Sequence, residues 1–253
     1  MDNKINISRQ ELNNLALGKR LIGSGSEGDV YILNNKTVLK KFNEIINPED
    51  YNCNDLLKYS DVKNESYYFT KLVYIVNDDV AAYTMDRCNG YNLTKINPLS
   101  IKFNDLLKAY IKFEKDTKLI SNMHIKGFDM IFNFMYDGKK FGAIDTIHYY
   151  TSDDDENKIY ESNITTFNSE LALLLVDGKF DDFIKKDHIL NELYKMSING
   201  KLIDISQFID LFNKKLSEYC DKKIVYLDDA KSLIRYGKQS YPNIPIYSLL
   251  KRK

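Results

Sequence analysis

Cysteine is scarce in this chain of 253 residues, and its scarcity limits the kinds of site that the protein can contain. The three cysteines, Cys53, Cys88 and Cys220, are odd in number and widely spaced. They match neither a disulfide framework nor a CxxC metal site, both of which need paired or closely spaced cysteines. We therefore expect a protein of a reducing compartment, the cytoplasm.

The chain also lacks net charge, since 36 basic residues balance 36 acidic residues. Without an excess of positive charge, there is no electrostatic reason to expect DNA, RNA or an anionic membrane as a partner. No apolar run is long enough to span a membrane, and residues 1–7 carry no apolar signal core. The composition therefore predicts neither a nucleic-acid partner nor a membrane span. The hydrophobic fraction of 43% is enough for one large domain or two small lobes.

Only 11 residues are glycine, but three of them, Gly23, Gly25 and Gly28, form the pattern G-x-G-x-x-G. Glycines in this pattern let the backbone approach phosphate oxygens closely. A dinucleotide-binding loop of this type opens into a helix, whereas β-branched and aromatic residues follow here in two runs separated by a polar turn. A P-loop would need Lys and then Ser or Thr after its last glycine, and Asp29 stands there instead. The pattern predicts a glycine loop between two antiparallel strands.

The hydrophobic pattern changes character along the chain. Strands are expected at residues 19–22, 30–33, 37–42, 72–76 and 80–85, with one helix at 61–72. Residues 9–21 otherwise read as a lead-in segment. Beyond residue 90 the pattern is mainly helical, with helices expected at 104–126, 163–176, 180–196 and 206–220. Asp137-Gly138 indicates a hairpin between two short apolar runs. The sequence therefore predicts an α+β protein, with a β-rich part followed by a helical part.

Several polar residues follow the glycine loop in the order that phosphoryl transfer requires. Lys40 lies on the strand after the loop, where an ammonium could reach nucleotide phosphates. Glu65, on the expected helix, could pair with Lys40. Asp129 follows the long helix, and Asn133 and Asp145 flank the expected hairpin. Such a trio could supply a hydroxyl-orienting carboxylate and two oxygen ligands for Mg²⁺.

These residues together resemble the protein-kinase-like superfamily over residues 18–150. The resemblance implies a bilobal fold, with an antiparallel N-lobe containing one helix at 1–85, a hinge at 86–92 and a helical C-lobe at 93–253. ATP and Mg²⁺ are the implied cofactors. Lys40, Glu65 and Asp129 are the implied catalytic residues, and Asn133 and Asp145 the metal ligands. The nucleotide would contact Lys40 and the residues Gly23, Gly25, Gly28, Val30, Val38, Met85, Asp86 and Cys88.

The sequence also departs from the family pattern, so several functions stay open. Only three residues separate Asp129 from Asn133, one fewer than in the family, and Thr146-Ile147 follow Asp145 in place of Phe-Gly. A Ser/Thr protein kinase-like enzyme that uses Asp129 as its base is the first expectation. A pseudokinase that only binds nucleotide or a partner is the alternative, as is a kinase for small alcohols such as aminoglycosides or choline.

Overall fold

A computed structural model of the chain describes residues 3–46, 52–127, 133–234 and 244–245. The chain forms two compact units. The first contains residues 1–88 together with the short segment 144–147, and the second contains residues 89–143 and 148–253. The sequence did not predict that residues 144–147 return to the first unit.

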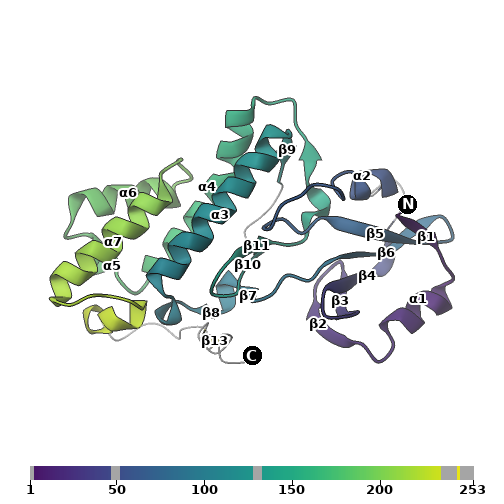
Figure 1. The fold of residues 1–253 in the computed structure, drawn as a ribbon, viewed down its shortest axis with the longest axis horizontal. Coiled ribbons are helices and arrows are strands. Elements are labelled where there is room, and N and C mark those ends of the chain that lie inside the picture. The colour runs from purple at the N-terminus through teal and green to yellow at the C-terminus, as the bar shows by residue number, and fades with distance from the viewer. Residues whose placement is uncertain (1–2, 47–51, 128–132, 235–243, 246–253) are drawn as a thin grey trace. The chain divides into compact units, whose positions relative to one another are not determined.

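The first unit is built on a mixed sheet of six strands, in the order β1-β5-β6-β4-β3-β2 (Figure 1). Its strands are β1 (Lys4–Asn6), β2 (Arg20–Ser24), β3 (Gly28–Ile32), β4 (Thr37–Ile46), β5 (Thr70–Val76) and β6 (Asp79–Asp86). Neighbouring strands are antiparallel except β1, which runs parallel to β5. The five predicted strands are confirmed, and the α+β class with them. The expectation of a purely antiparallel sheet is wrong because residues 4–6, for which no strand was expected, form β1 and run parallel to β5.

One helix covers each face of this sheet, as Figure 1 shows. Successive residues of a strand point to opposite faces, and β4 is apolar on both. Val38 and Phe42 pack with Leu56 of α2 (Cys53–Leu57). Leu39 packs on the other face with Leu12 of α1 (Arg9–Ala16). The sheet is therefore a two-sided core, in which the side chain of Lys40 shares the face of Val38 and Phe42.

Two expectations about the helices of this unit are wrong. The segment 9–16, expected as a lead-in, forms α1, which begins with a capping box between Ser8 and Glu11. The helix expected at 61–72 does not form. Asn64 Oδ1 accepts hydrogen bonds from the backbone N–H groups of Ser66 and Tyr67, a local turn that competes with a helix. Five consecutive residues, 66–70, are also buried, which a helix with one apolar stripe does not allow.

The second unit is mainly helical (Figure 1). Its α-helices are α3 (Phe103–Asn122), α4 (Glu156–Val176), α5 (Asp181–Ile184), α6 (His188–Ile198) and α7 (Ile205–Cys220). Its short strands are β7 (Tyr91–Asn92), β8 (Ile96–Asn97), β9 (Ile125–Lys126), β10 (Phe134–Tyr136), β11 (Phe141–Ala143), β12 (Tyr150–Thr151) and β13 (Ile244–Pro245). Short 3₁₀ helices occupy 93–95, 98–100, 146–148 and 227–233. Within the described residues, no helix has the length and apolar character needed to cross a membrane.

Most of the helical pattern agrees with the sequence, and the differences lie at helix ends. α3 ends at Asn122, four residues before the expected end, and residues 125–126 form β9 instead. α4 begins at Glu156, seven residues before the expected start, because the Asp155 side chain accepts hydrogen bonds from the N–H groups of Asn157 and Lys158. The helix expected at 180–196 is divided into α5 and α6, since Asp187 caps the second of them. The hairpin at Asp137-Gly138 is confirmed and pairs β10 with β11.

Candidate active site

Lys40 lies at the centre of the candidate site. Its side chain projects from β4 and is 8% exposed. The ammonium Nζ lies 2.5 Å from Glu27 Oε2 and 2.6 Å from Asp145 Oδ1. The rings of Phe42 and Tyr83 each lie with their centroid 5.9 Å from Nζ, within the range of cation–π attraction. The fold therefore holds a buried ammonium between two carboxylates.

Asp145 reaches Lys40 because the segment 144–147 packs into the first unit. Ile147 is buried in the core cluster that contains Val38 and Phe42. Thr146 Oγ1 donates a hydrogen bond to the backbone oxygen of Tyr68, at 3.0 Å. Asp145 itself has a φ of 59°, in the left-handed region. Strained backbone of this kind clusters at functional sites, where the surrounding structure holds it in place.

The Asp145 carboxylate fits the role of a ligand to a hard cation. Oδ1 accepts hydrogen bonds from Lys40 Nζ and, at 3.1 Å, from Tyr83 Oη. Oδ2 has no hydrogen-bond partner among the described residues, and the side chain is 28% exposed. The described part of the chain contains no group of three or more His, Cys, Asp or Glu that could hold a metal alone. Mg²⁺ is usually bound by one or two carboxylates and by substrate phosphates, so a single exposed carboxylate oxygen fits it.

The glycine loop forms the turn between β2 and β3, and its glycines have different roles. A Cβ on Gly28 would lie 2.2 Å from the backbone oxygen of Lys41, so the fold itself requires glycine there. A Cβ on Gly23 or Gly25 would make only ordinary contacts, with nearest atoms at 3.8 and 3.9 Å. Neither has a positive φ. The fold therefore gives no steric reason for glycine at positions 23 and 25.

The other predicted nucleotide contacts lie along the same strands. Val38 pairs with Met85 in the register of β4 and β6, and both side chains are buried in the cluster around Phe42. Val30 pairs with Lys40 and is partly buried against the same cluster. Asp86 ends β6 and is exposed, and Cys88 is half-buried at the end of the unit. Their role in binding adenine stays a prediction.

Glu65 does not hold Lys40, contrary to the expectation from the sequence. Glu65 lies exposed in the irregular segment after α2, because the helix expected to carry it does not form. Glu27 and Asp145 supply the carboxylates instead. Glu27 stands inside the glycine loop, one residue before β3. The pairing of β3 with β4 sets its backbone opposite Asn43, and its side chain extends from there to Lys40.

Two further predicted residues, Asp129 and Asn133, precede the hairpin of the second unit in the chain. Asp129 lies outside the described residues. Asn133 is half-buried and directly precedes β10, whose first residue, Phe134, pairs with Ala143. Asp145 follows the other strand of this hairpin, β11, by two residues in the chain.

Asn163 of α4 anchors the chain just before Asp129. Its side chain is buried, and its Oδ1 accepts a hydrogen bond from the Gly127 N–H at 2.8 Å. Its Nδ2 donates to Ser121 Oγ at 3.1 Å and to the Ile125 oxygen at 2.9 Å. The amide makes three hydrogen bonds, and both of its N–H donors are used. Asn163 therefore fixes the backbone two residues before the predicted base.

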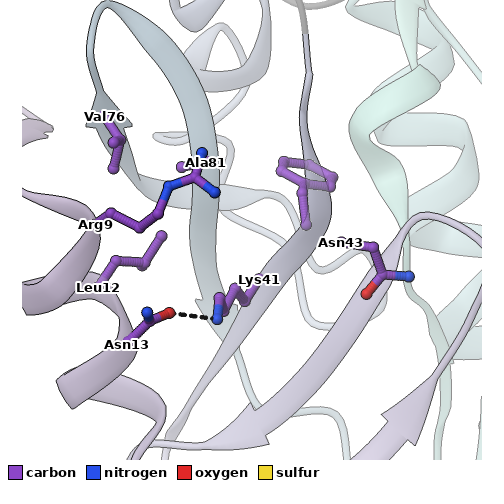
Figure 2. Close-up of a pocket in the computed structure, with 8 residues that line it drawn as sticks. Arg9, Leu12, Asn13, Lys41, Asn43, Val76 and Ala81 are labelled. Atoms are coloured by element: carbon purple, nitrogen blue, oxygen red, sulfur yellow. Dashed lines mark hydrogen bonds between the residues drawn. The ribbon is translucent and has the colours of Figure 1, made fainter.

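A pocket lies between α1 and the strands β4, β5 and β6 (Figure 2). Its lining combines apolar side chains, among them Leu12 and Val76, with two cations, Arg9 and Lys41. Lys41 Nζ donates a hydrogen bond to Asn13 Oδ1 at 2.6 Å. The eight lining residues are Arg9, Leu12, Asn13, Lys41, Phe42, Asn43, Val76 and Ala81. None of them has a carboxylate side chain, so this pocket lacks the acid–base and metal-binding groups of the Lys40 cluster.

Sequence reasoning missed three residues of the candidate site. In the sequence, Glu27 is a spacer position of the glycine motif. Its negative charge close to the loop's expected lysine is the one signal that could have indicated a contact with Lys40. Tyr83 and Asn163 gave no signal, because their partners are distant in the chain.

No protein-family model matches the chain, and no curated protein matches it.

Proposed function

We propose that the chain is an ATP- and Mg²⁺-dependent phosphotransferase of the protein-kinase-like type. The observation that carries the proposal is the ion pair between Lys40 and Asp145, at 2.6 Å. A lysine that contacts phosphates and a carboxylate that binds Mg²⁺ must lie side by side for phosphoryl transfer. The family resemblance assigned these two roles to residues far apart in the chain, and they meet in the first unit.

Two further features support nucleotide as the ligand. Gly23 and Gly25 lack a side chain where the fold would tolerate one. A backbone that must approach phosphate oxygens explains this choice. Asp145 also keeps one carboxylate oxygen without a described partner, as a site that takes Mg²⁺ needs.

Each residue of the site would have its own role in the reaction. Lys40 would hold phosphate oxygens of ATP beneath the glycine loop, and Met85, Asp86 and Cys88 would contact the adenine. Asp145 and Asn133 would hold Mg²⁺, which neutralises charge on the phosphates when it is bound. Asp129 would orient the acceptor hydroxyl and accept its proton. Asn163 would keep the segment before Asp129 in place through Gly127.

The acceptor is an alcohol, and we place a Ser or Thr hydroxyl of a protein first. The glycine loop carries all three glycines, which kinases of small molecules often lack. A small alcohol of the aminoglycoside or choline type is the alternative acceptor. Labelled ATP incubated with a protein lysate and with a panel of small alcohols distinguishes the two by where the label appears.

A pseudokinase is the second candidate, and one observation favours it. Only three residues separate Asp129 from Asn133, so the base and the metal ligand are closer in the chain than the family pattern requires. Such a protein would bind nucleotide without transferring phosphate.

Asp129→Asn separates the two candidates. If the chain is a kinase, ATP turnover falls by about a hundredfold or more while Mg-ATP binding persists, because general base catalysis is lost. Asp210→Asn, an exposed carboxylate on α7, is the matched control and should leave turnover unchanged. Turnover that survives Asp129→Asn contradicts the assigned base. Wild-type protein that binds Mg-ATP but shows no turnover is a pseudokinase.

A further inference from the structure

We propose that Glu27 competes with the phosphates of the nucleotide for Lys40, because its carboxylate lies 2.5 Å from the ammonium that the phosphates need. This inference rests on the proposed nucleotide site. It assigns to a residue of the glycine loop a part that the family resemblance did not give it. Glu27 would hold the loop down over Lys40 and would have to leave before phosphate oxygens could take its place.

The hydrogen bonds of Lys40 support this competition. An ammonium has three N–H donors, and Glu27 and Asp145 take two of them at 2.5 and 2.6 Å. The aromatic rings of Phe42 and Tyr83 lie on further sides of the ammonium. A phosphate chain that needs Lys40 therefore meets an ammonium that is already coordinated.

The charges of the cluster also favour competition between Glu27 and the phosphates. One ammonium faces two carboxylates, so the three groups together have a formal charge of minus one. An anionic phosphate chain that approached this group would be repelled unless one carboxylate moved away or a cation accompanied it. Asp145 is fixed by Tyr83 and by the packing of its neighbours. Glu27, which is 33% exposed, is the carboxylate that can turn into water.

The backbone of the loop is held independently of the Glu27 side chain. The Glu27 carbonyl accepts a hydrogen bond from the Asn43 N–H at 3.0 Å, and Asn43 Nδ2 donates to the oxygens of Gly25 and Ser26 at 3.3 Å. Gly25 N–H also bonds to the Gly28 oxygen at 3.0 Å. A rotation of the Glu27 side chain would therefore free Lys40 without unfolding the turn.

This arrangement predicts for which ligands the binding affinity depends on Glu27. Adenosine has no phosphate and does not need Lys40, so its affinity should not depend on Glu27. ADP and ATP must displace the carboxylate. A hydrogen bond to a charged group contributes enough free energy that its removal should change affinity by roughly tenfold or more.

The test compares the wild-type chain with Glu27→Gln by calorimetric titration with adenosine, with ADP and with Mg-ATP. Glutamine keeps the size of the side chain and removes its charge. We expect ADP and Mg-ATP to bind roughly tenfold tighter to Glu27→Gln, with the dissociation constant for adenosine unchanged. Asp55→Asn, an exposed carboxylate on α2, controls for the loss of one negative charge from the unit and should change none of the three.

Two results would overturn the inference alone. In the first, wild type binds ADP, and Glu27→Gln binds it with the same affinity or more weakly. Glu27 would then be a residue that positions Lys40. The other is an equal gain for adenosine, which would show an effect that does not pass through phosphate. If neither wild type nor variant binds any of the three ligands, the proposed function fails and the inference fails with it.

Discussion

The Lys40 ammonium lies 2.6 Å from the Asp145 carboxylate, although 105 residues separate the two in the chain. Lys40 is fixed by β4, at the centre of the sheet, and Asp145 by a four-residue segment that joins the same unit. The chain between them completes the first unit and then contributes residues 89–143 to the second. Closing a loop of this length costs conformational entropy, so the packing of Ile147 and the hydrogen bond of Thr146 must stabilise the contact.

Lys40→Met should abolish the stabilisation of the protein by Mg-ATP. Methionine fills similar space but cannot bind phosphate oxygens, so we expect the affinity for Mg-ATP to fall by about a hundredfold. The measurement is the thermal shift of the protein over a range of Mg-ATP concentrations. Lys41→Met is the matched control, because the neighbouring side chain projects from the opposite face of β4. An equal loss in both variants would contradict the assignment of Lys40 to the phosphates.

Two glycines of the loop should respond differently to the same change. Gly28→Ala places a Cβ 2.2 Å from the Lys41 oxygen and should destabilise the fold by about 3 kcal/mol, since strand backbone must move. Gly25→Ala meets no such contact and should change stability by only about 0.5 kcal/mol. Because its methyl group would face the phosphates, we expect Gly25→Ala to weaken Mg-ATP binding by about tenfold.

Urea unfolding and Mg-ATP titration of both variants check this prediction. Gly18→Ala is not a suitable control, because Gly18 has a positive φ. Ser26→Ala, at an exposed position of the same loop, is suitable and should change neither quantity. If Gly25→Ala binds Mg-ATP as well as wild type does, the loop does not cover the phosphates in the way we propose.

The sequence predicted the elements that local pattern controls. The strand with Lys40 has apolar residues on both faces, and the Asp137-Gly138 turn is a strong hairpin signal, so both could be read without the structure. Glu65 was misplaced because its spacing to later apolar residues looked helical. The turn at Asn64 and the burial of residues 66–70 exclude this helix, and neither shows in the local pattern of the sequence.

The partners of Lys40 were harder to predict than Lys40 itself. Glu27 reaches it only through the register of β3 and β4, which local sequence does not determine. Asn163 is an unremarkable polar residue until α4 brings it to Gly127, 36 residues away. Long-range contacts of this kind leave no periodic pattern. Candidate residues can therefore be identified from the sequence more easily than the residues that position them.

Asn163→Ala should destabilise the second unit strongly. The change removes the partner of the half-buried Gly127 N–H and of the buried Ile125 oxygen, and we expect a loss of about 3 kcal/mol in the free energy of unfolding. Ser162→Ala, at the neighbouring exposed position of α4, should change stability by less than about 0.5 kcal/mol. Urea denaturation followed by circular dichroism measures both. A small effect of Asn163→Ala would show that the segment before Asp129 is held by other contacts.

Asp187 should make the stability of the second unit depend on pH in acidic solution. Its carboxylate accepts a hydrogen bond from the Leu190 N–H at 3.0 Å and lies 3.2 Å from Lys215 Nζ. The hydrogen bond from the Leu190 backbone, helped by Lys215, lowers the pKa of Asp187 below its usual value of 3.8. A lowered pKa in the folded state means that the stabilisation is present above the unfolded pKa and is lost as pH falls through the folded pKa. The window therefore lies below pH 3.8.

Asp187→Asn tests this by comparing melting temperatures at pH 7 and at pH 2.5. Asparagine still caps a helix, so at pH 7 the variant loses only the charge contribution and should melt about 2 °C below wild type. At pH 2.5 wild-type Asp187 becomes increasingly protonated, and the difference should shrink. Asp210→Asn, on an exposed face of α7, should show no such pH-dependent difference. A difference that stays constant between the two pH values would mean that the lowered pKa of Asp187 does not stabilise the fold.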